Sequence, residues 1–97
     1  MRKNDFVFCI GYQGDTAIVD KKQEAQFGRL SARALFAKSL YKAALCSALW
    51  DKNEADLAFL LESYNAKSAR KVANIEALKR ALGVTEVYQK IQKTNYL

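Results

Sequence analysis

The chain has 97 residues, of which 51% are apolar and 27% are charged, so it is long enough for one domain with one core and too apolar to stay disordered. No run of about twenty apolar residues is present, which excludes a helix that spans a bilayer. With no histidine, the sequence lacks the side chain most used for proton transfer near neutral pH and the commonest transition-metal ligand. We therefore expect a single domain over residues 1–97 that binds no metal and no membrane.

The N-terminal region and the cysteines indicate the cellular location. The apolar stretch at residues 6–10 is too short for a secretion signal and lacks a small-residue cleavage site. Cys9 and Cys46 lie far apart, each among apolar neighbours, as is typical of reduced thiols buried in a cytosolic protein. We expect a cytoplasmic protein with free thiols, and a single disulfide is the alternative.

Two short segments near the N-terminus, residues 6–11 and 16–19, are rich in β-forming side chains. Between them, Gly14 can adopt a positive φ and Asp15 can hydrogen-bond its own backbone, which is the chemistry of a short hairpin loop. The sequence therefore predicts a β-hairpin over about residues 5–20.

This hairpin would be apolar on both faces. Side chains alternate along a strand, so Phe6, Phe8 and Ile10 would lie on one face, opposite Val7 and Cys9. An isolated hairpin is marginal in water, so we expect one face on the helices and the other face, or the edge, against a second copy of the chain. The candidate self-association residues are Phe6, Val7, Phe8, Cys9, Ile10 and Ile18.

A short helix is expected over residues 21–27, where Asp20 can cap the first amides and Gly28 can take the left-handed position that ends a helix. From Ser31, a good N-cap, to Trp50 the chain is full of strong helix formers and has no breakers. Apolar residues cover more than one narrow stripe of this central helix, so we expect it to be contacted on several sides.

Two further helices follow the central one. The first opens with Asn53 as its cap and runs through Tyr64. The second opens at Ser68 and ends at Gly83, and its apolar residues recur at intervals of three or four residues.

A last short helix, capped by Thr85, would turn Val87 and Ile91 inward and leave residues 95–97 as a tail that frays. It completes a predicted helical bundle over about residues 31–94. The fold class is therefore mainly α within the α+β class, with an N-terminal β-hairpin followed by a bundle of about four helices.

Charge is uneven along the chain. Residues 1–66 carry nine basic and eight acidic side chains, whereas residues 67–97 carry seven basic and two acidic ones. Three cations crowd the start of the helix that is expected to open at Ser68. Free amides and positive charge together can hold a phosphate or an acidic surface there. The candidate anion or nucleic-acid patch is Lys67, Arg70, Lys71, Lys79, Arg80, Lys90 and Lys93. The alternative is that these are ordinary solvated side chains.

Residues 82–85, Leu-Gly-Val-Thr, resemble the turn of a helix-turn-helix, a motif that reads DNA with its second helix. The two positions that the motif buries in that second helix are here Gln89 and Gln92. The same four residues are equally a helix C-cap followed by an N-cap.

No pattern of catalytic residues is present in the sequence. Gly11 and Gly14 lack the third glycine of a dinucleotide-binding loop. Asp15 and Asp20 flank the second strand at a spacing that places them on opposite sides, so they do not form a carboxylate pair. The serines have no histidine to activate them. We expect no enzymatic activity and no cofactor.

The leading functional hypothesis is a non-enzymatic interaction module that self-associates as a homodimer, through the hairpin or through the exposed flank of the central helix. Its motivation is the excess of apolar side chains in the hairpin. The alternative is a DNA- or RNA-binding regulator that uses the basic last third of the chain, a surface that an acidic protein would also fit.

Overall fold

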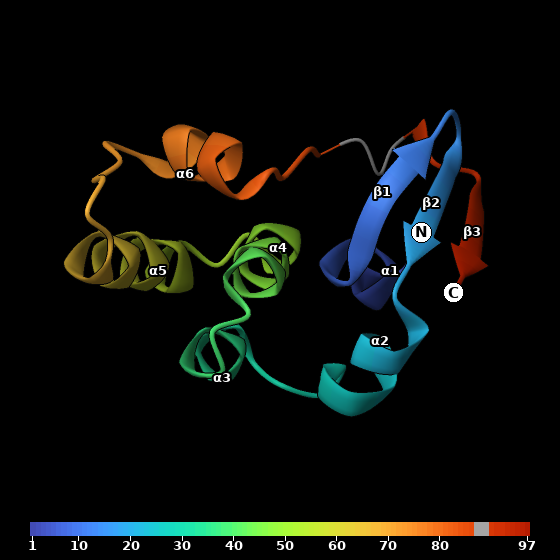
Figure 1. Cartoon of the computed structure of the whole chain (residues 1–97), viewed down its shortest axis with the longest axis horizontal. Coiled ribbons are helices and arrows are strands. Elements are labelled where there is room, and N and C mark those ends of the chain that lie inside the picture. The colour runs from blue at the N-terminus through green and yellow to red at the C-terminus, as the bar shows by residue number, and fades with distance from the viewer. Residues whose placement is uncertain (87–89) are drawn as a thin grey trace.

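The computed structural model describes residues 1–86 and 90–97. The helices of this part of the chain are α1 (Lys3–Val7), α2 (Lys21–Phe27), α3 (Ala32–Ala37), α4 (Tyr41–Asp51), α5 (Glu54–Lys67) and α6 (Ile75–Leu82), and the strands are β1 (Cys9–Gln13), β2 (Thr16–Val19) and β3 (Lys93–Tyr96). The three strands form one sheet at one end of the molecule, and α3, α4, α5 and α6 lie at the other (Figure 1). The predicted α+β class, with an N-terminal hairpin followed by helices, is confirmed.

The hairpin turns where the sequence predicts. β1 and β2 are antiparallel, and Gln13 pairs with Thr16 across a two-residue loop. Gly14 in this loop has a φ of +60°, a conformation that costs glycine nothing because it has no Cβ. The register shifts between Cys9 and Gly11, which is a β-bulge.

The first strand begins later than predicted, because residues 6–8 are not extended. Phe6 and Val7 belong to α1, and Phe8 follows as its C-cap. The Asp5 carboxylate accepts a hydrogen bond from the Arg2 amide at 3.1 Å, which caps the first turn of this helix. All three apolar side chains are buried in the core. Burial against α4 therefore outweighs the β propensity of this segment.

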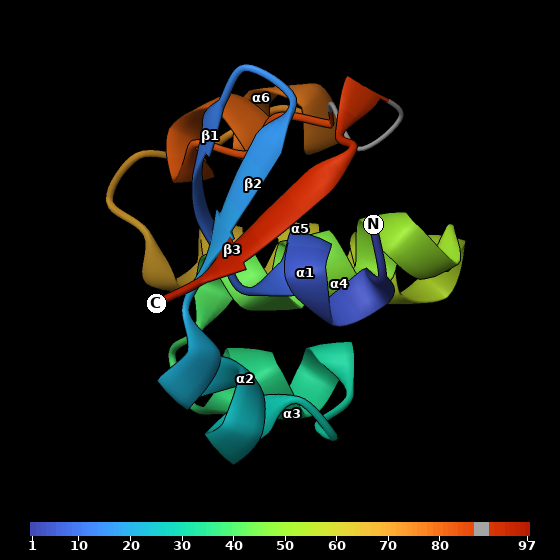
Figure 2. The same ribbon diagram turned by 90° about the vertical axis from the view of Figure 1, so that its right-hand side faces the viewer.

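The C-terminal residues form a strand, so the prediction of a frayed tail was wrong. β3 runs parallel to β2, with Thr16 opposite Lys93 and Val19 opposite Tyr96. Figure 2 shows β2 between β1 and β3. The predicted last helix is also wrong in the described residues, because Thr85 and Glu86 are not helical and Lys93–Tyr96 is a strand; its Val87 lies outside the described residues. Ile91, which was expected to face inward, is buried.

The predicted central helix is two helices, α3 and α4, which pack against each other. Ser39 between them has a φ of +63°. The N–H of Leu40 donates to the Leu35 carbonyl at 3.0 Å, and the N–H of Ser39 donates to the Phe36 carbonyl at 2.9 Å. These two bonds are a Schellman motif, which ends a helix and is usually made with glycine at the left-handed position.

Two predicted caps at helix starts are confirmed. The Asp20 side chain accepts from the Gln23 amide and opens α2, and the Asn53 side chain accepts from the Asp56 amide and opens α5, both at 3.0 Å. Gly28 ends α2 as expected but with a right-handed φ of −66°. A Cβ at that position would collide with the backbone of α2, so close approach and not a left-handed turn requires glycine there.

The helix that was predicted to open at Ser68 starts later. Its N-cap is Asn74, whose side chain accepts from the Ala77 amide at 2.9 Å. The segment before it is held to α5 by Asn65, which donates to the Val72 carbonyl at 2.9 Å and accepts from the Val72 amide at 2.8 Å. The end of the helix at Gly83, with a φ of +71°, is confirmed.

Helix α4 lies at the centre of the core. Seven consecutive residues of this helix, from 43 to 49, are buried. α1, α3, α5 and α6 all contact α4, as expected for a helix that is apolar on several sides. The alanines in it permit these close approaches, and burial of its leucines contributes roughly 1.5–3 kcal/mol per side chain.

The two ends of the chain meet at Asp5, which is only 3% exposed. The Tyr96 hydroxyl donates to the Asp5 carboxylate at 2.7 Å, and the Arg2 guanidinium donates to the Tyr96 hydroxyl at 2.6 Å. Burial disfavours the ionised carboxylate, but the hydrogen bonds from Tyr96 and Arg2 outweigh it, and the pKa of Asp5 is lowered.

Replacing this carboxylate tests the link between the chain ends. We expect Asp5→Asn to lower the free energy of unfolding by about 1–2 kcal/mol near neutral pH, because the Arg2 amide and guanidinium and the Tyr96 hydroxyl lose a charged acceptor. Since the folded pKa is lowered, the carboxylate stabilises the fold above the unfolded pKa of about 4 and this contribution is lost as the pH falls through the folded pKa. Urea unfolding at neutral and acid pH should therefore show the two proteins converging in acid. The exposed acid of the hairpin loop provides the control, because Asp15→Asn should change little; equal effects of both variants would contradict the assignment.

The break at Ser39 makes a second prediction. A non-glycine residue at a left-handed φ is strained, so Ser39→Gly should raise the free energy of unfolding by about 0.5–1 kcal/mol. Ser39→Val should lower it, because a β-branched side chain fits this conformation worst. Thermal and urea denaturation of the two variants measure the difference. If a continuous helix ran through residue 39, Ser39→Val would be more stable than Ser39→Gly, because glycine destabilises a helix interior more than valine does.

Candidate functional site

Most of the residues predicted for self-association are covered by their own chain. Phe6, Val7, Phe8 and Cys9 are buried in the core, and Ile18 is partly buried. Ile10 differs, because 56% of its surface is exposed. The excess apolar surface that motivated the prediction is therefore reduced to one side chain on β1.

β1 is an edge of the sheet. In the part of the chain that the structure describes, β2 pairs with one side of β1 and no strand pairs with the other. The strand sequence, Cys-Ile-Gly-Tyr-Gln, contains no charged residue, whereas β3 at the opposite edge begins with Lys93. Proteins commonly protect edge strands with lysine or other charges, so an uncharged edge is free to pair with another chain.

The bulge and the neighbouring helices shape the surface around Ile10. Bulges re-aim side chains, and Ile10 lies at the position where the register of β1 shifts. Beside it is a groove of about 440 Å³. Its lining includes Leu40, which precedes α4, Tyr41, which begins α4, and Leu82, which ends α6. We call Ile10, this groove and the adjoining pocket the β1 surface.

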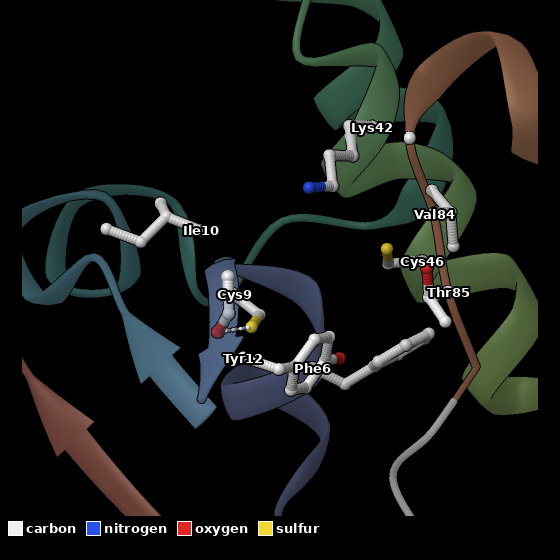
Figure 3. Close-up of a pocket in the computed structure, with 10 residues that line it drawn as sticks. Phe6, Cys9, Ile10, Tyr12, Lys42, Cys46, Val84 and Thr85 are labelled. Carbon is white, nitrogen blue, oxygen red and sulfur yellow. Dashed lines mark hydrogen bonds between the residues drawn. The ribbon is translucent and has the colours of Figure 1, made fainter. Parts of the chain in front are cut away.

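The adjoining pocket lies between β1, α4 and the segment that follows α6, and encloses about 220 Å³ (Figure 3). Cys9 and Tyr12 reach it from β1, and Lys42 and Cys46 reach it from α4, while Ile10 points away from them. The Cys9 thiol donates to the Gly11 carbonyl at 3.0 Å. The two cysteines are free, as predicted.

The Cys46 thiol and the Tyr12 phenol of this pocket both have raised pKa values. Burial raises the pKa of the Cys46 thiol to about 12, although the nearby Lys42 ammonium opposes the rise. Burial and then the Cys9 thiol raise the pKa of the Tyr12 phenol. A protonated thiol and a protonated phenol are poor nucleophiles and poor bases.

The candidate basic patch does not form one surface. The helix α5 ends with Lys67, and Arg70 and Lys71 lie in the α5–α6 loop, at the opposite end of the molecule from β3 and Lys93 (Figure 1). Lys90 belongs to the β3 end by sequence. The expectation that three cations crowd a helix start was wrong, because α6 starts at residue 75.

On α6, the two predicted basic residues differ in their partners. The Lys79 ammonium is 2.9 Å from the Glu76 carboxylate and 2.8 Å from the Glu86 carboxylate. These two acids raise the pKa of Lys79 and neutralise its charge locally. Arg80 is exposed and makes no ion pair within residues 1–86 and 90–97.

The turn at residues 82–85 is a helix C-cap in the structure. The Val84 amide donates to the Lys79 carbonyl at 2.9 Å, which with the left-handed Gly83 completes a Schellman motif. The position of Gln89, which a helix-turn-helix would bury, lies outside the described residues, and Gln92 is exposed.

The chain matches no protein-family model, no curated protein and no solved structure. Among residues 1–86 and 90–97, no helix has the length and apolarity that crossing a membrane requires. Nor do three or more possible metal-ligating side chains gather anywhere in these two segments.

The groove beside Ile10 was missed by reasoning from the sequence, because its lining residues come from five elements, α1, β1, α2, α4 and α6. Leu40 lies within the stretch from Ser31 to Trp50 that was predicted as one helix, and Leu82 lies at the end of the helix predicted to end at Gly83. The available signal was the apolar pattern of residues 39–43, which does not distinguish a buried face from a groove wall.

The raised pKa of Cys46 predicts a slow thiol. In a Cys9→Ala variant, where Cys46 is the remaining cysteine, native protein near pH 8 should react with a disulfide reagent about a thousandfold more slowly than protein in urea, because the thiolate fraction falls with the pKa. Spectrophotometric thiol titration measures both rates. Similar rates in the two conditions would show that the thiol is accessible and ionised.

Proposed function

We propose that this protein is a non-enzymatic interaction module that self-associates as a homodimer through the β1 surface. The observation that carries the proposal is the exposure of Ile10 on an uncharged edge strand, next to an apolar groove. Unpaired strand edges present a row of amide and carbonyl groups that pair readily with a second chain.

The occupant that best fits the edge is a second copy of β1. Two copies related by a twofold axis would pair antiparallel, and the two three-stranded sheets would become one sheet of six strands. In such an isologous contact each Ile10 faces the groove of the other copy, so both apolar surfaces are covered at once. A side chain in this central position is typical of an interface hot spot.

The pocket chemistry supports binding over catalysis. The thiol of Cys46 and the phenol of Tyr12 have raised pKa values, which keeps both groups protonated near neutral pH. Two free, buried cysteines are typical of proteins in a reducing compartment, and we include a cytoplasmic location in the proposal.

Charge at the edge tests the interface. We expect Ile10→Lys to raise the dissociation constant of the dimer about thirtyfold or more, because a hot-spot side chain contributes about 2 kcal/mol and lysine adds repulsion across the axis. Sedimentation equilibrium at micromolar concentrations measures the change. Leu97→Lys is the matched control: it also replaces an exposed apolar residue with lysine, but next to β3, and it should leave the dimer intact.

Salt gives a second readout of the same assembly. Each copy carries a net charge of +6, so added salt should screen the repulsion between copies and strengthen the dimer. A wild-type protein that stays monomeric at high micromolar concentration would overturn the proposal. A dimer that Leu97→Lys disrupts and Ile10→Lys does not would place the interface at β3 instead.

A further inference from the structure

Another hollow lies among α3, the start of α4 and the end of α5. It encloses about 220 Å³ and is lined by Phe36, Tyr41, Tyr64, Lys67 and Ser68. We call it the aromatic pocket. Its residues come from α3, α4, α5 and the residue after α5, so no local sequence pattern indicates that three rings share one site.

The three rings of the aromatic pocket differ in their exposure. Phe36 is buried, and its ring centroid is 4.9 Å from that of Tyr41, with the two planes tilted by 53°. Tyr41 and Tyr64 are partly exposed. The Lys67 ammonium lies 5.1 Å from the Phe36 centroid, close enough for a cation–π contact that holds positive charge at the pocket.

Further positive charge is fixed beside the pocket by the loop that follows α5. The Ser68 hydroxyl donates to the Arg70 carbonyl at 2.6 Å and accepts from the Arg70 amide at 3.1 Å. Asn65 clamps Val72 by two hydrogen bonds, so the intervening Arg70 and Lys71 lie in an ordered loop. Neither of these two cations makes an ion pair in the described part of the chain, and both are exposed.

From this geometry we propose that the aromatic pocket and the adjoining loop bind single-stranded nucleic acid. Partly exposed tyrosine rings offer surfaces on which unpaired bases stack, and free cations beside them match the phosphates. An acidic peptide would use the cations and leave the rings without a role. A duplex would keep its bases stacked internally and unavailable to the pocket.

Tyr64 tests the stacking, because it lies outside the β1 surface. Fluorescence anisotropy with a labelled oligothymidylate or oligouridylate of about twelve nucleotides, in low salt, measures the affinity. We expect Tyr64→Leu to weaken binding by about fivefold to a hundredfold and Tyr64→Phe, which keeps a ring, to retain it. Circular dichroism checks that both variants fold.

The cations are tested through the salt dependence. Removing two phosphate contacts with Arg70→Ala and Lys71→Ala together should reduce the slope of log affinity against log salt by about 1.4. The control is Lys21→Ala with Lys22→Ala, which removes the same charge from exposed positions on α2. Any of four results would overturn the proposal. The first two are absence of binding in low salt and equal effects of the two double variants. The others are equal affinity of Tyr64→Leu and Tyr64→Phe, and displacement by polyglutamate as efficient as by the oligonucleotide.

Discussion

The buried carboxylate of Asp5 joins the two ends of the chain, and much of the fold depends on that link. It caps α1 through the Arg2 amide and holds the last strand through the Tyr96 hydroxyl. While α1 is helical, its apolar residues pack on α4 and do not extend the hairpin. While β3 is docked, β2 is an interior strand, and β1 and β3 are the two outer strands of the sheet in the described residues. The Asp5 contact thus holds β3 at the edge opposite the candidate interaction surface on β1.

Local chemistry explains which parts of the fold the sequence could predict. The left-handed positions at Gly14 and Gly83 carry the residue that such a conformation favours, and the caps at Asp20 and Asn53 carry the required acceptors. Ser39 adopts the same left-handed conformation with no such signal in the sequence. Its conformation accompanies the packing of α3 against α4, which is a tertiary contact that propensity does not encode.

The candidate site shows the same division between local and distant information. The sequence identified an apolar hairpin that needs cover, and most of its side chains are covered by α4 and other elements of the same chain. Ile10 was among six candidates, and only its place at the bulge distinguishes it. The basic patch was read as one surface because its members lie close in sequence, whereas the loop after α5 and the strand β3 lie at opposite ends of the molecule. The three rings of the aromatic pocket lie on three different helices, so no local pattern in the sequence brings them together.

Tyr41 connects the two proposed surfaces, because it lines both the groove beside Ile10 and the aromatic pocket. In the proposed functions the two surfaces are therefore thermodynamically coupled, and electrostatics fixes the sign. A net charge of +6 on each copy opposes dimer formation, and bound phosphates at Lys67, Arg70 and Lys71 would offset part of that charge. Nucleic acid would then favour the dimer, and by linkage the dimer would favour nucleic acid by the same factor. Salt acts on the two steps in opposite directions, since it screens the repulsion between copies and weakens the attraction to phosphate.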